Sequence, residues 1–381
     1  MMNRVMVVSA ARTPLGAFCG QLEGLSEQQL AAAAMLEAVR RAGVEPGLID
    51  EVIVGIAKQT SRPSNGGRHA MLLAHLPEKI PAYTVQRQSA SGLQAVANGY
   101  WAIRCGDAGV VLAGGAESMS QIPFEIRNSR YVLGCEIVDA IPVQETGAQP
   151  VERYGLLTAA CAADHFAQRF CFTEGELEAF AAASLQKARA AADRGFFREE
   201  AFPVTVRKGK KEESIDRDEL PAKAALLAPP ADGAAMCLLA SPERAAELGL
   251  PVLAEILSVG IAAVDPRYAA MAAAKAGKLA IERAGLTLPE VDLIELNETS
   301  AAECLAILKE WQAPGIEPEA LAKRINPSGG ALALGNPWGA AGAVLLTKAV
   351  HELRRRGGGT GIVAVTAEGG QGMAMVIKSG G

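Results

Sequence analysis

The chain has 381 residues, of which 50% are apolar and 4% are aromatic, and its formal net charge is −5. This length exceeds one ordinary core, so we expect two domains or one fused double domain packed mainly through aliphatic side chains. The acidic balance argues against a nucleic-acid partner and against binding to an anionic membrane surface. We expect neither a membrane span nor a secretory signal, because no apolar run and no N-terminal pattern of either kind is present.

Cysteines and histidines show no spacing typical of a metal site. The seven cysteines are scattered without a CxxC pair, and the four histidines have no ligand spacing. Unpatterned cysteines in odd number are typical of reduced thiols. We therefore expect a cytoplasmic protein without a metal or another resident cofactor.

The predicted elements repeat along the chain. After an opening strand at residues 4–8, a helix, a glycine, a short turn and an apolar strand occupy residues 37–55, and the same unit returns at residues 279–296. Each half continues with a helix rich in small residues and a strand that is apolar throughout, at residues 89–115 and 339–365. Continuously apolar strands indicate burial on both faces. The pattern predicts a duplicated α/β domain with stacked layers.

The stretch between the halves has a different pattern and is expected to be an inserted lid. It contains a predicted helix at residues 173–194, with Thr173 as N-cap and Glu176 as its capping-box partner, and a charged hairpin at residues 204–213. Residues 221–230 are expected to form a loop. The expected regions are an N-terminal half, an insertion and a C-terminal half, at residues 1–118, 119–250 and 251–381.

Six short segments, in order along the whole chain, resemble motifs of the thiolase family. They are Ser9–Pro14, the helix that follows Ser89, Ala113–Met119, Asn297-Glu298, Gly330–Pro337 and Gly369–Gly372. Thiolases make or cleave 3-oxoacyl-CoA by Claisen chemistry. The resemblance implies an α/β/α/β/α layered fold with duplicated βαβαβ halves, a CoA thioester as substrate or ligand, and a homo-oligomer or a hetero-oligomer with another thiolase subunit.

Thiolase chemistry depends on groups that move protons and hold negative charge. A cysteine at a helix N-terminus attacks the thioester, and a second cysteine takes and returns the α-proton. A histidine and a water held by an asparagine stabilise the enolate oxygen, and backbone N–H groups form a second oxyanion hole.

This chain departs from the family at the positions that carry these roles. The nucleophile position holds Ser89, the histidine position holds Asn336, and the acid/base cysteine position holds Thr366. Glu368 replaces a glycine of the C-terminal loop, whereas Asn297 is retained. The resemblance also places substrate contacts on four positions, Met271, Ser300, Gly369 and Gly370.

The substituted groups are weaker acids and bases near neutral pH. A free cysteine has a pKa of about 8.5, whereas an aliphatic hydroxyl ionises close to water, at ~15.7. Ser89 therefore requires a general base, which Asn336 cannot be. Glu368 could act as that base, or it could face solvent or pair with an arginine.

Structural roles compete with catalytic ones at the other positions. Ser89 could cap the following helix, and Asn336 could shape the turn before Pro337. Asn297 could hold a water or satisfy backbone groups. The loop that meets CoA in thiolases is shortened, and only its end, Asp232-Gly233-Ala234, matches the family.

Three functions remain open from the sequence. The first is a catalytically degenerate subunit that acts with a competent thiolase in acyl-CoA metabolism. The second is an active acyltransferase with Ser89 as nucleophile on a CoA thioester. The third is an acyl-CoA binding protein without turnover.

Overall fold

The computed structural model describes residues 4–59, 63–130, 134–312 and 318–380, and its central feature is a ten-stranded mixed sheet. The strand order is β12-β13-β14-β11-β1-β10-β5-β3-β4, with β2 beside β10. These strands are β1 (Met6–Arg12), β2 (Gly16–Ala17), β3 (Glu51–Gly55), β4 (Ala82–Val85), β5 (Val110–Ser118), β10 (Ala231–Ala240), β11 (Ala254–Ala263), β12 (Leu293–Leu296), β13 (Gly359–Ala367) and β14 (Gln371–Ser379). The halves join where Met6 and Val7 of β1 pair with Glu255 and Ala254 of β11.

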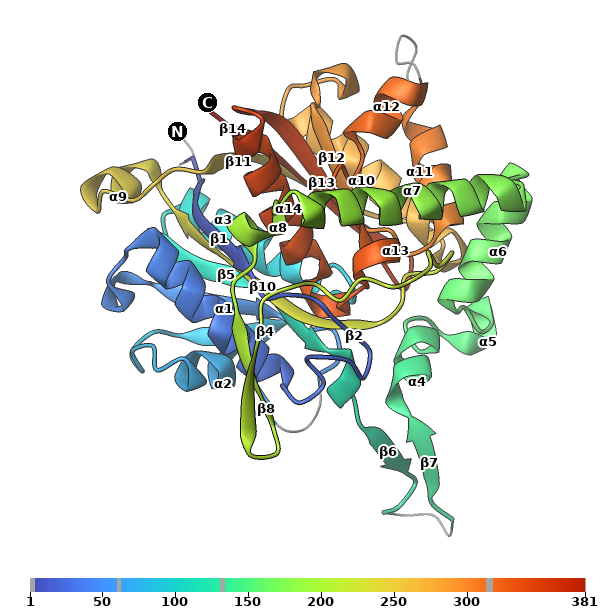
Figure 1. Cartoon of the computed structure of the whole chain (residues 1–381), viewed down its shortest axis with the longest axis horizontal. Coiled ribbons are helices and arrows are strands. Elements are labelled where there is room, and N and C mark those ends of the chain that lie inside the picture. Colours follow the sequence, from blue (N-terminus) through green and yellow to red (C-terminus); the bar gives the residue numbers. More distant parts are fainter. Residues whose placement is uncertain (1–3, 60–62, 131–133, 313–317, 381) are drawn as a thin grey trace.

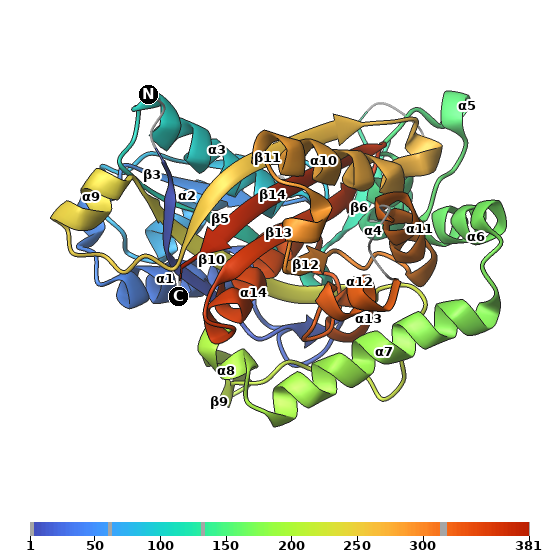
Figure 2. The same cartoon turned by 90° about the horizontal axis from the view of Figure 1, so that it is seen from above.

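Helices form three layers around the two halves of the sheet (Figures 1 and 2). One outer layer is α1 (Glu27–Ala42) and α2 (Gly66–Leu73), and the other is α10 (Ala269–Arg283) with α11 (Ala301–Trp311). Between the halves lie α3 (Ser91–Cys105) and α14 (Ala341–Arg355), which contact each other and strands of both halves. The expected α/β/α/β/α fold is confirmed.

The repeated sequence units form equivalent elements. Helix α1 ends at Gly43, in the left-handed region with φ +68°, and leads into β3, while α10 is followed by Gly285 with φ +70° and leads into β12. Only glycine adopts this conformation at no steric cost, so it ends each helix cleanly. The second unit of each half is also as expected, because α3 leads into β5 and α14 leads into β13.

The middle of the chain forms a part outside the layers, from which the hairpin β6–β7 projects, whereas α7 lies across the layers (Figure 1). It holds the hairpins β6–β7 and β8–β9 and four helices, α4 to α7, and its capping box at Thr173 and Glu176 is present as expected. The elements are β6 (Phe124–Arg127), β7 (Glu136–Asp139), α4 (Ala140–Thr146), α5 (Val151–Tyr154), α6 (Ala159–Phe170), α7 (Glu174–Asp193), β8 (Val204–Lys208) and β9 (Lys211–Ile215). Strand β10 falls within residues 119–250, yet it lies between β1 and β5, so it belongs to the N-terminal half of the sheet.

Shorter elements complete the described chain. They are the helices α8 (Phe197–Glu200), α9 (Pro242–Glu247), α12 (Pro318–Arg324) and α13 (Ala331–Leu334), with the 3₁₀ turns η1 (Pro46–Leu48), η2 (Met119–Gln121), η3 (Pro266–Tyr268), η4 (Leu288–Glu290) and η5 (Trp338–Ala340). Among the described residues, no helix has the length and apolar character needed to cross a membrane.

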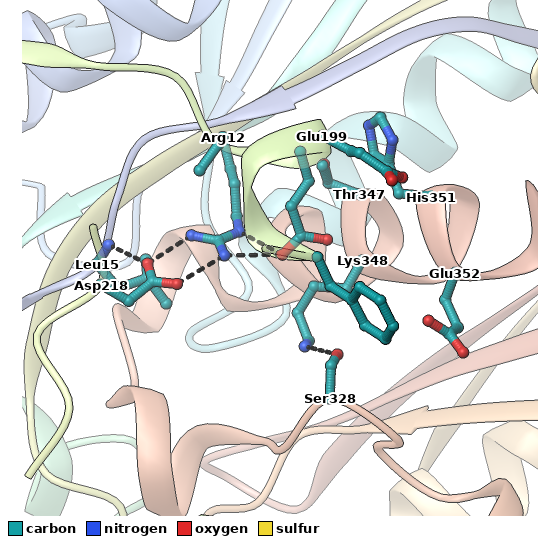
Figure 3. Close-up of polar contacts among 12 residues, drawn as sticks. Arg12, Leu15, Glu199, Asp218, Ser328, Thr347, Lys348, His351 and Glu352 are labelled. Atoms are coloured by element: carbon teal, nitrogen blue, oxygen red, sulfur yellow. Dashed lines mark hydrogen bonds and ion pairs between the residues drawn. The ribbon is translucent and has the colours of Figure 1, made fainter. Parts of the chain in front are cut away.

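A buried arginine ties the first strand to the inserted region (Figure 3). The Arg12 side chain is fully buried at the end of β1, and its guanidinium donates to Glu200 Oε1 at 2.7 Å and 2.9 Å. It also donates to both carboxylate oxygens of Asp218, at 2.6 Å and 2.8 Å. Removing one partner of such a buried pair leaves an uncompensated charge, so this network holds the segments around Glu200 and Asp218, within the insertion, against the end of β1.

Glu295 on β12 is a second buried ionisable group, but its carboxyl oxygens have no direct partner among the described residues. Within the described chain, neither of its carboxylate oxygens forms a hydrogen bond. Burial raises its pKa from 4.5 to about 8, although the nearby Lys348 opposes the shift. Between these two pH values the folded chain keeps a proton that the unfolded chain releases, so stability falls as the pH rises.

We predict that Glu295→Gln flattens this part of the pH dependence. At pH 5 the variant should nearly match the wild type, and at pH 8.5 its free energy of unfolding should be higher by about 4 kcal/mol, because the ionisation cost is removed. Urea unfolding at both pH values measures the difference. Glu282→Gln, which changes an exposed glutamate, is the control; a variant curve parallel to that of the wild type would contradict the prediction.

Candidate active site at the Ser89 turn

Ser89 lies in a tight turn between β4 and α3. Gln88 adopts a left-handed conformation with φ +47°, and the Ser91 hydroxyl holds the turn by accepting from Arg87 N at 2.8 Å and donating to Gln88 O at 2.6 Å. The N-cap of α3 is Ala90. The capping role considered for Ser89 is therefore wrong, and its side chain, 1% exposed, serves another contact.

That contact is with Glu368. The Ser89 hydroxyl lies 3.2 Å from Glu368 Oε1 and 3.3 Å from Oε2. Glu368 opens the turn between β13 and β14, in which Gly369 and Gly370 have φ of +81° and +77°. A Cβ on Gly370 would lie 2.4 Å from Val264 O, so two glycines are required for the turn that presents this carboxylate to Ser89. Glu368 does not face away into solvent.

The environment of Glu368 makes its carboxylate a stronger base than an exposed glutamate. Burial raises the pKa of this carboxyl group, and Glu145 raises it further. The backbone N–H groups of Glu368 and Ser89 and the Ser89 hydroxyl lower it, but the net shift is upward. A carboxylate with a raised pKa is a better proton acceptor, and the Ser89 hydroxyl lies within hydrogen-bond distance of this one.

Hydrogen bonds from the C-terminal half and the insertion hold the Ser89 turn. Arg87 Nη1 donates to Gln371 Oε1 at 2.6 Å, which links the turn to the first residue of β14. Gln144 Nε2 of α4 donates to Gln88 Oε1 at 3.1 Å. The segment before Ser89 is therefore tied by side-chain hydrogen bonds to the strand that follows Glu368 and to the insertion.

Glu117 holds the loop that contains Asn336 against α3, the helix that follows Ser89. Its Oε2 accepts from Ala57 N at 2.9 Å and from Gly339 N at 2.8 Å, and burial raises the pKa of this carboxyl group to about 7. A Cβ on Gly92 would lie 2.7 Å from Gly339 O, so η5 rests directly on the first turn of α3. Asn336 and Pro337 immediately precede η5, so they lie near the same end of α3.

Three side chains at the expected catalytic positions have unused polar atoms. Asn297 Nδ2, Asn336 Oδ1 and Thr366 Oγ1 are buried and form no hydrogen bond within the described residues. The backbone of Asn336 pairs with the loop before β10, since its N donates to Pro229 O at 2.8 Å. This supports a turn role for Asn336, whereas the Asn297 amide nitrogen satisfies no backbone group.

Two small cavities adjoin these residues. One, of about 60 Å³, is lined by Thr366, Glu368, Gly369 and Thr299, together with Glu145 and Glu303. The other, of about 20 Å³, is lined by Asn297 and by Gly335 and Pro337, which flank Asn336. Groups of at least three histidine, cysteine, aspartate or glutamate residues arranged to hold a metal are absent from the described parts of the chain.

The expected substrate contacts separate in the structure. Gly369 lines the larger cavity, Gly370 lies beside Val264, and Ser300 is the buried N-cap of α11. Met271 lines a different hollow with Arg169 and Tyr268, whereas Ala269 of the same helix reaches the cavity.

Glu145 and Glu303 were not anticipated as site residues. Glu303 Oε2 accepts from the hydroxyls of Thr299 and Ser300 at 2.7 Å and 2.9 Å. The pattern Ser300-Ala301-Ala302-Glu303 matches a capping box, so the sequence does place Glu303 in the first turn of a helix. For Glu145 the sequence carries no such signal, since it reaches the cavity from the inserted region.

Comparison with known proteins gives the same family for both halves. Residues 5–232 match the family model for the thiolase N-terminal domain, and residues 250–379 match that for the thiolase C-terminal domain. An acetyl-CoA acetyltransferase of Pseudomonas aeruginosa is 36% identical over 99% of each chain, and a beta-ketoadipyl-CoA thiolase of the same organism is 34% identical over 99% of this chain and 100% of its own.

Solved structures are similar over the same length. The acetyl-CoA acetyltransferase of Bacillus anthracis has a TM-score of 0.92 and the human mitochondrial 3-ketoacyl-CoA thiolase one of 0.91. Each is 32% identical and covers 99% of both chains.

The contact between Ser89 and Glu368 predicts the behaviour of a thiol at this position. In Ser89→Cys the neighbouring carboxylate should disfavour the thiolate, and adding Glu368→Gln should lower the thiol pKa by about 1–2 units. The rate of alkylation by iodoacetamide against pH, followed on the peptide that carries the substitution, measures this pKa. Glu178→Gln, on the exposed side of α7, is the control, and equal pKa values with and without Glu368→Gln would contradict the prediction.

Proposed function

The chain belongs to the thiolase family, and we propose that it is a catalytically degenerate subunit that acts with a competent thiolase in acyl-CoA metabolism. The observation that carries this proposal is the contact of Ser89 Oγ with Glu368 at 3.2 Å, in a site where Asn336 and Thr366 occupy the other two proton-handling positions.

Claisen chemistry requires a base for the α-proton and donors for the enolate oxygen. Thr366 is a poor acid and base near neutral pH, and Asn336 can donate a hydrogen bond but cannot shuttle a proton. The nearest carboxylate adds negative charge where the reaction itself develops negative charge. Three altered positions together are expected to remove thiolysis by this chain alone.

The family supplies the remaining parts of the proposal. Its relatives act on CoA thioesters, so we propose an acyl-CoA as the ligand and no metal or other resident cofactor. All seven cysteines are free thiols, which fits a reducing cytoplasm. We propose a hetero-oligomer with a catalytic thiolase, or a homo-oligomer, and no nucleic-acid or membrane partner.

The test is whether thiolysis depends on Ser89. The tagged chain, purified from cells that produce it naturally, should bring with it an acetoacetyl-CoA thiolysis activity that Ser89→Ala leaves unchanged. The recombinant chain alone should show no turnover above background. Turnover by the homomer that disappears in Ser89→Ala would overturn the proposal.

A second candidate is acyl transfer through Ser89, which the position of Glu368 favours. Glu368 would accept the hydroxyl proton while Ser89 Oγ attacks the thioester carbonyl and CoA leaves as the thiol, so an oxygen ester forms on the protein. Intact-mass measurement after incubation with acetyl-CoA detects one added acetyl group. Its presence in the wild type and loss in Glu368→Gln would replace the first candidate by this one, whereas binding without an adduct would indicate an acyl-CoA binding protein.

Restoring one residue should not restore thiolysis. We predict that Ser89→Cys alone is inactive with acetoacetyl-CoA and CoA, because Asn336 and Thr366 still move no protons. The combination of Ser89→Cys, Asn336→His, Thr366→Cys and Glu368→Gly should exceed the single variant by about 100-fold or more, since single proton-transfer groups contribute about 10²–10⁴-fold. Initial rates of acetoacetyl-CoA loss measure both, and substantial activity in the single variant would contradict the prediction.

A further inference from the structure

The cavity of about 60 Å³ next to the Ser89–Glu368 contact is lined by acidic side chains. Three carboxylates line it, from Glu145 on α4, Glu303 on α11 and Glu368 at the β13–β14 turn. Among the described residues that line it, lysine, arginine and histidine are all absent. No cationic side chain among these lining residues therefore balances the three carboxylates.

The carboxylates are close enough to influence one another. Burial raises the pKa of Glu303, and the neighbouring Glu368 raises it further. Glu145 in turn raises the pKa of Glu368. The hydrogen bonds within the described chain engage Oε2 of Glu303 and Oε1 of Glu145, so each of these carboxylates keeps an oxygen that accepts no hydrogen bond.

A neutral acceptor faces the same cavity. Thr366 is 4% exposed and lines the cavity, and its Oγ1 is buried without a partner among the described residues. Such an oxygen costs free energy unless a ligand or water donates to it. Three carboxylates and one unused hydroxyl oxygen around about 60 Å³ match a group of a few heavy atoms with several N–H donors and a positive charge.

We propose that this cavity binds a primary ammonium group, carried by the acyl part of a CoA thioester. The ammonium would donate to the free oxygens of Glu303 and Glu145 and to Thr366 Oγ1. A neutral alkyl end group would leave these acceptors unused, and a carboxylate end group would be repelled. The thioester part of this inference rests on the proposed function, whereas the recognition of the ammonium group does not.

Three thioesters that differ only at the end of a short acyl chain test the selectivity. β-Alanyl-CoA ends in an ammonium, butyryl-CoA has a methyl group in its place, and succinyl-CoA ends in a carboxylate. In titration calorimetry with the full chain, we expect β-alanyl-CoA to bind about tenfold more tightly than butyryl-CoA, and succinyl-CoA to bind most weakly. Equal affinities, or a preference for succinyl-CoA, would overturn the proposal.

Variants assign the preference to the cavity. Glu303→Gln keeps an oxygen that accepts from Thr299 and Ser300, and Glu145→Gln is a second change on a different element. Each should reduce the ratio between β-alanyl-CoA and butyryl-CoA. Glu152→Gln, which alters an exposed glutamate of α5 outside the cavity, should leave the ratio unchanged. A ratio that survives both cavity variants would locate the selectivity elsewhere and overturn the proposal.

Free amines separate this inference from the function proposed for the chain. Propylammonium has the ammonium group without CoA, and 1-propanol is its uncharged control. Ligand-observed NMR detects weak binding of either molecule. Binding of propylammonium alone, lost in Glu303→Gln, would support the ammonium site even if no thioester binds. Failure of propylammonium to bind, with thioesters bound regardless of charge, would leave the proposed function standing and remove this inference.

Discussion

The close approach of α3 and α14 at glycine positions is the constraint on which the candidate site depends. A Cβ on Gly342 would lie 2.6 Å from Leu93 Cβ, and a Cβ on Gly115 would lie 2.3 Å from Gly339 O. Real Cβ atoms do not come this close to other atoms, so the central layer exists only because these positions carry no side chain. The helix that follows Ser89 and the segment that follows Asn336 are consequently packed directly against each other.

Within this frame a carboxylate lies beside Ser89, and the loss of Claisen chemistry that we propose rests on this placement. Donors that stabilise an oxyanion must be free to meet the charge as it develops. Here the backbone N–H groups of Ser89 and Glu368 already act on a carboxylate. Fold and site chemistry are set by different residues, so a family scaffold can be kept while the residues at its site change.

The layered fold was predictable from sequence because repeated apolar patterns and helix-ending glycines report on local structure and burial. The motifs also predicted which segments meet at the site, since six of them lie in order along the chain. The direction of individual side chains was not predictable. Glu368 turns toward Ser89 because Gly369 and Gly370 adopt positive φ, and Ala90 takes the N-cap because Gln88 turns left-handed. Met271 illustrates the same limit, since neighbouring residues of one helix line different hollows.

The pairing of Arg12 with Glu200 and Asp218 has a consequence for the order in which the protein is made. A chain leaves the ribosome from its N-terminus, so Arg12 emerges long before either carboxylate. Strand β1 pairs with β10, which begins at Ala231, and with β11, which begins at Ala254, and both are synthesised much later. The first strand of the nascent chain thus stays without its neighbours until two thirds of the polypeptide exist, and during that interval its apolar residues are available to chaperones.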